Sequence, residues 1–381
     1  MILVEAVSLR LLLIIEHEAL SIESIIMINM QKIIGFTDLE IAEAIKKRQL
    51  LSIEIEFSSR CNLKCSYCYA EKSLFRDDEL DLEEMYDVIS QAKALGARKI
   101  IYLGAGEPFL DKKLEPIIHY VHKLGLDHII FTNGTVINPQ EARFLYEHKV
   151  VVVVKHSSND EATFDRLSGG KGAFKSMKRG MKFLTEAGYP DESHHLGIES
   201  IISVDNIHEI PTMWRWARHN NIIPYIECVT RKGGGASQNK LAPDKEPTRI
   251  LFQELSRIDR EEFSFVWDPF PPIAGFACKR HLYSCIVNSQ GFVQPCVGVD
   301  IQVGNIRQEK LGTILQNSPV LKDLSQIYNT IKGPCKTCEH NGECYGCRGN
   351  AYSLTGDYLA SDSTCWRIKD EVASSCSFCK K

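Results

Sequence analysis

Three cysteines, Cys61, Cys65 and Cys68, lie in the short run CNLKCSYC, directly after the apolar stretch 51–57. An iron–sulfur cubane needs four ligands, so three thiolates leave one iron free to bind something that is not protein. The alternatives are a zinc ion completed by a residue from elsewhere, or three reduced thiols without a metal. The cluster is favoured because the loop follows a predicted strand and further chemical motifs come after it in order.

The gaps of three and then two residues, with an aromatic residue before the last cysteine, resemble those of the radical S-adenosylmethionine (SAM) enzymes. In that family the amino and carboxylate groups of SAM occupy the open iron. Reductive cleavage of SAM then gives a 5′-deoxyadenosyl radical that takes a hydrogen atom from the substrate. The resemblance implies SAM as cofactor, a SAM-binding 4Fe-4S cluster, and a reducing partner such as flavodoxin or ferredoxin.

The same resemblance implies a SAM pocket at the ends of the following strands. Gly104-Ala105-Gly106-Glu107-Pro108 is similar to the family's Gly-Gly-Glu-Pro motif, whose backbone and glutamate hold the ammonium of SAM; the alternative is a plain strand-to-helix turn. Asn133 would line the pocket or form an Asn-Gly turn. The expected cofactor-binding residues are Tyr67 (near adenine), Gly104, Gly106, Glu107, Pro108, Asn133 and Ser157 (toward the ribose).

A second group of cysteines resembles the SPASM extension of radical SAM enzymes, which carries two auxiliary 4Fe-4S clusters. The family pattern implies Cys278, Cys285, Cys296 and Cys347 as ligands of the first, and Cys335, Cys338, Cys344 and Cys365 as ligands of the second. The gap between Cys344 and Cys347 is one residue shorter than in the family pattern. Zinc ribbons are the alternative, because they also use Cys-x2-Cys pairs.

Helical and strand patterns alternate through residues 51–259, with strands at 51–57, 98–103, 127–132, 150–155, 196–203 and 222–229. Strands separated by helical crossovers predict a parallel sheet. The resemblance implies a partial (β/α)6 TIM-like barrel followed by a small cysteine-rich cluster-binding domain, an α/β fold. We expect an N-terminal extension and lead-in helix (1–49), the barrel (50–265), the SPASM-like domain (266–367) and a tail (368–381).

The chain of 381 residues has a net charge of −4 and a pI near 6.3, so a nucleic-acid partner is not favoured. The apolar run 11–15 is too short to span a bilayer and is flanked by glutamates, so we expect no membrane partner and a cytoplasmic location. Met27 and Met30 are alternative starts. Of the remaining cysteines, Cys228 is expected in the core, and Cys376 and Cys379 at a frayed end.

Glutamates lie on predicted barrel strands, which are normally apolar on both faces. Glu54 and Glu56 share one face of the first strand, and Glu199 and Glu227 lie on the fifth and sixth. They either pair with Lys155, His156 or Arg231, or line a substrate cavity. We expect Glu199, Glu227 and Lys155 to act in catalysis.

We therefore expect a radical SAM oxidoreductase or lyase that acts on a small polar metabolite, such as an amino sugar or cyclitol, by oxidation, dehydration or epimerisation. The alternative is a maturase that modifies a ribosomally made peptide or protein. A third interpretation is a non-catalytic electron-transfer protein, but such a protein would have no use for a SAM site.

Overall fold

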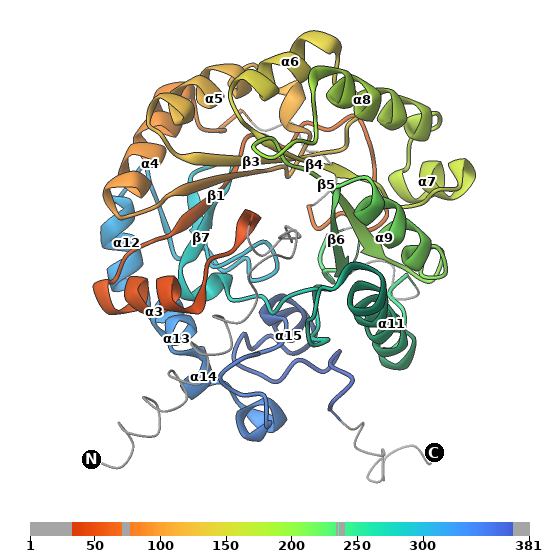
Figure 1. Ribbon diagram of the computed structural model, residues 1–381. Helices are drawn as coiled ribbons and strands as arrows, with labels where there is room; N and C mark the ends of the chain where they lie inside the picture. The colour runs from red at the N-terminus through yellow and green to blue at the C-terminus, as the bar shows by residue number, and fades with distance from the viewer. Residues whose placement is uncertain (1–32, 71–76, 234, 236–240, 369–381) are drawn as a thin grey trace, which may run out of the picture.

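The structure, a computed structural model, describes residues 33–70, 77–233, 235 and 241–368 (Figure 1). Met27, Met30, Cys376 and Cys379 lie outside these residues. Six strands predicted from the sequence are present: β1 (Ser52–Glu56), β2 (Lys99–Leu103), β3 (Asp127–Thr132), β4 (Val151–Lys155), β5 (Leu196–Ile202) and β6 (Ile223–Cys228). The predicted helices between and after them are α4 (Leu82–Ala94), α5 (Leu114–Lys123), α6 (Pro139–Glu147), α8 (Ala173–Ala187), α9 (Ile210–His219) and α11 (Lys245–Phe263).

The predicted mixed α/β architecture with a mainly parallel sheet is confirmed. Strands β1 to β6 are neighbours in sequence order and pair in parallel. Figure 1 shows α4, α5, α6, α8 and α9 in an arc around the outside of this curved sheet, with α15 (Arg348–Thr355) on the opposite side, where the arc is open. This is the arrangement expected of a partial barrel built from βα units.

The sheet continues into the cysteine-rich region. This continuation of the sheet was not predicted from the sequence. Strand β7 (Ser284–Val287) pairs in parallel with β1, and β8 (Phe292–Gln294) and β9 (Gly304–Asn305) follow in antiparallel order, giving nine strands. These strands are too short to show an alternating pattern in a segment rich in turns. The C-terminal region is therefore joined to the barrel by backbone hydrogen bonds along β1.

Short polar signals start the outer helices. Asp81 and Asn138 are N-caps whose side chains accept hydrogen bonds from backbone N–H groups of the first turn. The carboxylates of Glu84 and Glu141 accept hydrogen bonds from the backbone N–H groups of these two cap residues. Such reciprocal capping boxes satisfy N–H groups that a helix start would otherwise leave unpaired. A capping box at Thr37 also starts α3 (Asp38–Lys47), which lies within the expected lead-in segment.

The two faces of β1 meet different surroundings. Ile53 and Ile55 pack in the core between the sheet and the outer helices, where they are at most 1% exposed. Glu54 and Glu56, which alternate with them, point to the inner side of the sheet. The inner face thus carries buried charge, and the outer face holds the helical layer.

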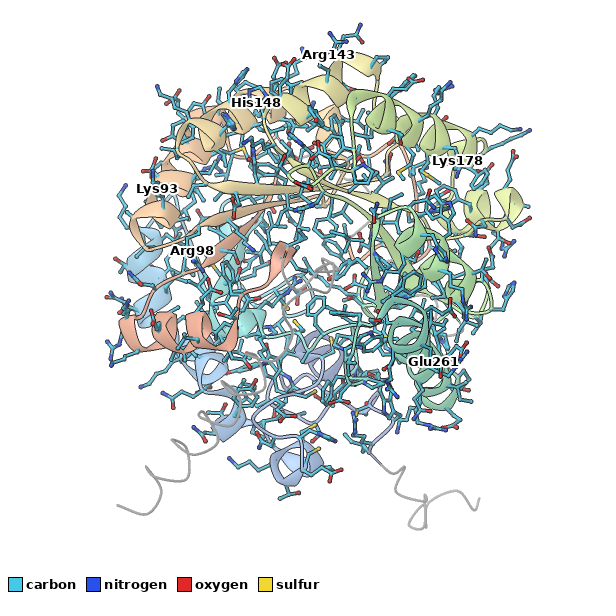
Figure 2. All side chains as sticks on the ribbon, viewed as in Figure 1. Lys93, Arg98, Arg143, His148, Lys178 and Glu261 are labelled. Atoms are coloured by element: carbon cyan, nitrogen blue, oxygen red, sulfur yellow. The ribbon has the colours of Figure 1, made fainter. Side chains whose placement is uncertain are left out.

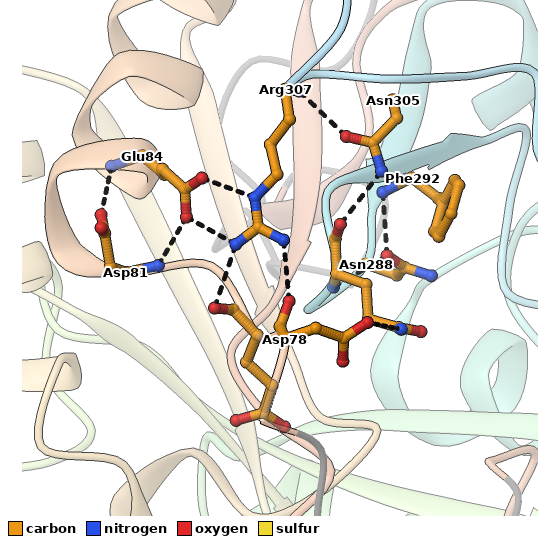
Figure 3. A network of polar contacts seen from close by, with 9 residues as sticks. Asp78, Asp81, Glu84, Asn288, Phe292, Asn305 and Arg307 are labelled. Atoms are coloured by element: carbon orange, nitrogen blue, oxygen red, sulfur yellow. Dashed lines mark hydrogen bonds and ion pairs between the residues drawn. The ribbon is translucent and has the colours of Figure 1, made fainter.

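Arg307 ties the C-terminal region to the barrel (Figure 3). Its guanidinium makes two bonds to Glu84 at the start of α4, with Nε–Oε1 at 2.5 Å and Nη2–Oε2 at 2.8 Å. It also donates to the carbonyls of Asp78 and Glu79, at 2.9 and 3.2 Å. This bidentate pair fixes the β8–β9 region against the lead-in to α4.

Helices α12 (Leu311–Asn317), α13 (Pro319–Ser325) and α14 (Ile327–Thr330) complete the C-terminal region. Within the described ranges, every helix is too short or too polar to cross a membrane. Figure 2 shows Lys93, Lys178 and Glu261 at the periphery, on the outer helices α4, α8 and α11.

Candidate functional site

A cavity of about 220 Å³ lies on the inner side of the sheet. One part of its wall is the Cys61–Cys68 loop after β1 and the Gly104–Glu107 loop after β2. Another part comes from the C-terminal region, with Cys278, Cys296 and Cys347. The two sets of cysteines, far apart in the sequence, therefore face one space.

The first cysteine loop is held by helix α7 (Glu161–Ser168), an element that the sequence did not predict. The backbone N–H groups of Lys64 and Ser66 donate to the carbonyls of Ser168 and Leu167, at 3.0 and 2.8 Å. Gly169, with φ of 64°, ends α7, and a Cβ there would come within 2.4 Å of the Lys64 carbonyl oxygen. Only glycine permits this close approach.

All three cysteines of this loop line the cavity. Burial raises the pKa of each thiol, for Cys65 to about 12, and the nearby Cys68 adds to the rise for Cys61 and Cys65. Partly buried thiols on one short loop are a donor set that a metal cation converts to thiolates. The residues thus fit an iron–sulfur cluster with an open position.

The Gly104–Glu107 loop packs directly on the first cysteine loop. A Cβ at Gly106 would come within 2.0 Å of the Arg60 carbonyl oxygen, and one at Gly104 within 1.6 Å of the Gly106 carbonyl oxygen. The Glu107 N–H donates to the Arg60 carbonyl at 2.7 Å, and the Tyr69 hydroxyl donates to the Gly104 carbonyl at 3.0 Å. The glycines are therefore required by packing.

Glu107 uses its carboxylate to hold the next loop. Oε1 accepts from Thr132 Oγ1 at 2.6 Å, and Oε2 accepts from the Asn133 N–H at 2.7 Å. Burial raises the pKa of Glu107 to about 7. Asn133 in turn donates to Asn62 Oδ1 at 2.9 Å. Glu107 and Asn133 both line the cavity, and their hydrogen bonds connect the loops that follow β1, β2 and β3.

Two residues expected at the SAM pocket lie behind the wall. Ser157 is fully buried and does not line the cavity; its Oγ lies 2.6 Å from the hydroxyl of Tyr67. Tyr67 does line the cavity and packs with Leu167 and Ile201. Pro108 starts a 3-10 turn and is also outside the lining. The serine hydroxyl is thus engaged with the protein itself.

Charged residues from β1, β4, β5 and β6 form the inner wall. Lys155 Nζ lies 2.5 Å from Glu199 Oε1, and the two are partners in strand register. Arg280, which the sequence did not single out, lies 2.8 Å from Glu54 Oε1. Of the partners considered for the strand carboxylates, Lys155, His156 and Arg231, Lys155 pairs with Glu199. Two of the buried carboxylates are therefore neutralised by partly buried cations.

Glu227 is held differently. It accepts a hydrogen bond from the Tyr225 hydroxyl at 3.1 Å. Burial, and then the neighbouring Glu199 carboxylate, raise the pKa of Glu227 to about 7. Burial alone would lower the pKa of Lys155, but Glu199 and Glu227 outweigh it and raise that pKa. Glu227 is thus a group that changes charge near neutral pH.

Close backbone packing brings Cys296 and Cys347 to the cavity. A Cβ at Gly298 would meet the Cα of Gly349 at 2.6 Å, so the Cys296 loop and the start of α15 touch with no side chain between them. Backbone N–H groups donate to both sulfurs, from Val299 at 3.3 Å and from Asn350 at 3.4 Å. Such donors stabilise thiolate ligands.

Arg348 supports a cluster at these cysteines. It is 1% exposed and lines the cavity, and its Nη1 donates to the carbonyls of Tyr358 and Ala360, at 3.1 and 2.5 Å. Its Nε and Nη2 have no hydrogen-bond partner among the described residues. Buried unpaired donors of a cation suit an anionic group, which a thiolate-bound cluster is.

Cys285 does not join this group. It lies on β7 in register with Ile53, is 1% exposed, and packs in the core beneath the outer helices with Val287. It is absent from the cavity lining that contains Cys278, Cys296 and Cys347. The structure therefore brings together three of the four ligands expected for the first auxiliary cluster.

Three of the other expected ligands are neighbours. Burial raises the pKa of Cys344 and Cys365 to about 11, and the proximity of Cys335 contributes in both cases. The loop is fixed by a bond from the Cys335 N–H to Ser361 Oγ at 2.8 Å. Cys338 is part of the same turn, which begins at Gly333. Cys228, expected in the core, also lines the cavity.

Comparison with known proteins identifies the family. The radical SAM superfamily model matches residues 55–213, and the model of an iron-sulfur cluster-binding domain, SPASM, matches residues 278–339. The Fe-coproporphyrin III synthase of Methanosarcina barkeri is 33% identical over 360 residues, covering 82% of this chain and 87% of that protein. The chain is a radical SAM enzyme. Its C-terminal region is a SPASM domain, and its cofactors are SAM, a 4Fe-4S cluster and auxiliary iron–sulfur clusters.

Other relatives of this radical SAM enzyme differ in what their names say they make. The AdoMet-dependent heme synthase of M. barkeri is 27% identical and covers 81% of this chain and 94% of that protein. The PqqA peptide cyclase of Methylorubrum extorquens is 27% identical and covers 81% and 83%. The structure of Streptococcus suis SuiB bound to precursor peptide SuiA matches with a TM-score of 0.67 at 18% identity, covering 86% and 79%, which shows a shared fold.

Proposed function

We propose that this radical SAM enzyme oxidises a side chain of a peptide or protein. The observation that carries the proposal is the inner wall of the cavity, where Glu54, Glu199 and Glu227 come together from three strands. Lys155 and Arg280 are already paired with two of them. A wall of hydrogen-bond acceptors suits a substrate that presents amide and amine donors, and it disfavours a polyanion.

The relatives support a substrate larger than the amino sugar or cyclitol that the sequence led us to expect. One relative, which covers as much of this chain as the heme synthase does, is named a peptide cyclase. The heme synthase and the Fe-coproporphyrin III synthase are named for porphyrin products. A tetrapyrrole is the second candidate, because the relative that is 33% identical is an Fe-coproporphyrin III synthase. Carboxylate-rich porphyrins would need cations on this wall, and Lys155 and Arg280 are already paired there, so the geometry favours the peptide.

In this proposal Cys61, Cys65 and Cys68 hold the SAM-binding cluster. Gly104, Gly106, Glu107 and Asn133 would hold SAM, with Tyr67 in the wall of the cavity and Ser157 behind it. When bound, SAM and the clusters would supply the 5′-deoxyadenosyl radical and take up an electron. Cys335, Cys338, Cys344 and Cys365 hold the outer auxiliary cluster. The predicted domain boundaries and a flavodoxin or ferredoxin reductant belong to the same proposal.

Residues of the protein then take up the proton that the oxidation releases. After hydrogen abstraction, oxidation of the substrate carbon releases one proton and one electron. Glu227, with a pKa near 7, is placed to take the proton. Glu199, fixed by Lys155, holds the amine or amide of the substrate against the wall. We assign these three residues to catalysis on this ground.

The SAM site is tested with two cysteine variants of the anaerobically reconstituted protein. Cys65→Ala should lower 5′-deoxyadenosine formation to background, because it removes a ligand of the SAM-binding cluster. Cys338→Ala should retain SAM cleavage but yield no product. SAM cleavage that persists in Cys65→Ala would contradict the assignment of the Cys61–Cys68 loop as the site of the SAM-binding cluster.

The substrate class is tested with two probes in parallel. One is every short open reading frame beside the gene, made as a peptide and followed by mass spectrometry for loss of two hydrogen atoms. The other is an iron porphyrin that carries carboxylate side chains, followed by its visible absorption. Turnover of the porphyrin with no change in any peptide would reject the peptide proposal and establish the second candidate.

A further inference from the structure

The segment before α3 closes one end of the barrel. Ile33 and Ile34 are 7% and 5% exposed, and they pack in one cluster with inner-face residues of the sheet, among them Ile101, Ile129 and Val153. Figure 1 shows this start of the described chain, in red, inside the arc of strands and helices. Ile34 also lines the cavity. The segment is therefore an end wall of the cavity.

Polar and aromatic contacts hold this end wall in place. The buried Lys99 on β2 donates from Nζ to the carbonyls of Ile33 and Gly35, at 2.7 and 2.9 Å. Its Nζ also lies 4.5 Å from the centroid of the Phe36 ring, and Phe36 packs edge-on against Tyr283 with centroids 5.2 Å apart. Hydrogen bonds from a charged donor are stronger than neutral ones, so the position of the wall is fixed.

The part of the cavity beside the end wall is apolar. Its lining comes from the segment before α3, from β2, β3 and β6, and from the chain after α11, with Ile34, Ile101, Phe131, Tyr225 and Ile273. These five residues pack in one cluster, and the rings of Phe131 and Tyr225 meet edge-on with centroids 5.7 Å apart. The apolar end, as we call the space lined by these five residues, suits an apolar group.

Charge appears further along the strands. Lys155 and Glu227 each follow an apolar inner-face residue by two positions, toward the carboxyl ends of β4 and β6. The loops with the cysteines and glycines of the SAM motif follow the carboxyl ends of β1 and β2. On the side of β1 the apolar end borders Glu54, whose charge is balanced by Arg280 at 2.8 Å. The cavity is thus apolar at the end wall and charged toward the SAM loops.

We propose that the apolar end binds an apolar side chain of the peptide substrate, and that Ile34 determines how large this side chain can be. The inference rests on the proposed function, because it takes the occupant of the cavity to be a peptide. A side chain that enters the apolar end leaves its backbone amide at the charged wall. Glu199, which the proposed function assigns to hold an amine or amide, lies on that wall.

The apolar end is tested with toluene, which matches the side chain of phenylalanine, on the reconstituted protein. Headspace gas chromatography measures how much toluene the protein takes up. Saturable binding of about one toluene per chain is expected, and n-butylammonium, which matches the side chain of lysine, should not compete. The absence of saturable toluene binding, or its displacement by n-butylammonium, would overturn the inference.

Two substitutions at Ile34 locate the bound toluene. Ile34→Trp fills the apolar end and Ile34→Asp places a charge in it, so each should weaken toluene binding by at least about 10-fold. Ile45→Trp, on the exposed side of α3, is the matched control and should bind like the wild type. Iron content and the urea unfolding midpoint show whether each variant folds. Equal toluene binding in folded Ile34 and Ile45 variants would contradict the assignment.

A peptide that the protein oxidises gives a second test of the same subsite. Ile34→Ala lengthens the apolar end and should shift product formation toward peptides with a larger apolar residue at the modified position, whereas Ile45→Ala should not. Oxidation of a charged side chain would overturn this inference and leave the peptide proposal intact. Toluene binding that depends on Ile34, with no peptide oxidised, would reject the proposed function and support the apolar subsite on its own.

Discussion

Glu227 lies on the inner face of β6, where its pKa near 7 predicts a pH-dependent reaction. Because burial and Glu199 raise this pKa, the carboxyl is protonated below about pH 7 and becomes a base only above it. The yield of product per SAM cleaved should therefore rise with pH through about 7. Glu227→Gln should abolish the rise and lower product formation by about 10²-fold or more while SAM cleavage continues.

The control for this prediction is Glu261→Gln, on the outer helix α11, which should retain the wild-type profile. The measurement is the ratio of product to 5′-deoxyadenosine from pH 6 to 8.5, roughly one unit or more on each side of the transition. A flat wild-type profile, or a Gln variant that still shows the rise, would exclude Glu227 as the base.

Individual residues show which part of the site the sequence could predict. The cysteines at Cys-x3-Cys-x2-Cys spacing and the inward glutamates were predictable, because each follows from local spacing or strand alternation. The roles of Arg280 and Arg348 were not, since a lone arginine gives no local signal. Cys285 appeared equivalent to its neighbours in sequence, and only the register of β7 on β1 separates it from them.

At the scale of loops and strands, the packing of Gly106 on Arg60 predicts a sensitive position. An added Cβ would lie 2.0 Å from the Arg60 carbonyl oxygen, and backbone atoms on both sides cannot move apart without displacing the first cysteine loop. Strain of about 1–3 kcal/mol is expected. Gly106→Ala should weaken SAM binding by about 10- to 100-fold.

A matched glycine provides the comparison. At Gly312 in α12 an added methyl group meets only the end of the Leu95 side chain, at 3.3 Å. Gly312→Ala should therefore leave SAM affinity unchanged, and alanine also favours the helix. Equilibrium dialysis of SAM with the reconstituted proteins measures both. Equal affinity in the two variants would show that the loop tolerates the side chain.

The elements differ in how well the sequence predicts them. Six strands and their crossover helices have long runs with clear periodicity, and capping signals such as Asp81 and Asn138 mark where helices begin. Helix α7 is short, and β7 to β9 have two to four residues each, so their patterns are too brief to recognise. Their partners are set by distant parts of the chain, which local periodicity cannot reveal.

The whole molecule is organised around β1, which carries the first cysteine loop and pairs with strands from both regions. On one edge it pairs with β2 of the barrel and on the other with β7 of the SPASM domain. The cavity is closed by both regions, with Glu54 on β1 paired to Arg280. Movement of the C-terminal region relative to the barrel would therefore change the distance between the SAM loop and the auxiliary cysteines.

Arg307 should stabilise this arrangement measurably. Its side chain joins the β8–β9 region to Glu84 and to the carbonyls of Asp78 and Glu79, and the pair with Glu84 is bidentate (Figure 3). Arg307→Ala should lower the free energy of unfolding by about 1–2 kcal/mol, since the ion pair with Glu84 and the hydrogen bonds to the two carbonyls are lost. Lys310, whose exposed pair with Asp87 spans 3.3 Å, is the control. Lys310→Ala should change stability by less than about 0.5 kcal/mol.

Urea unfolding under anaerobic conditions, followed by circular dichroism and by cluster absorption, gives the free energy of unfolding of both variants. An Arg307 variant as stable as the Lys310 variant would show that backbone pairing along β1 alone joins the two regions.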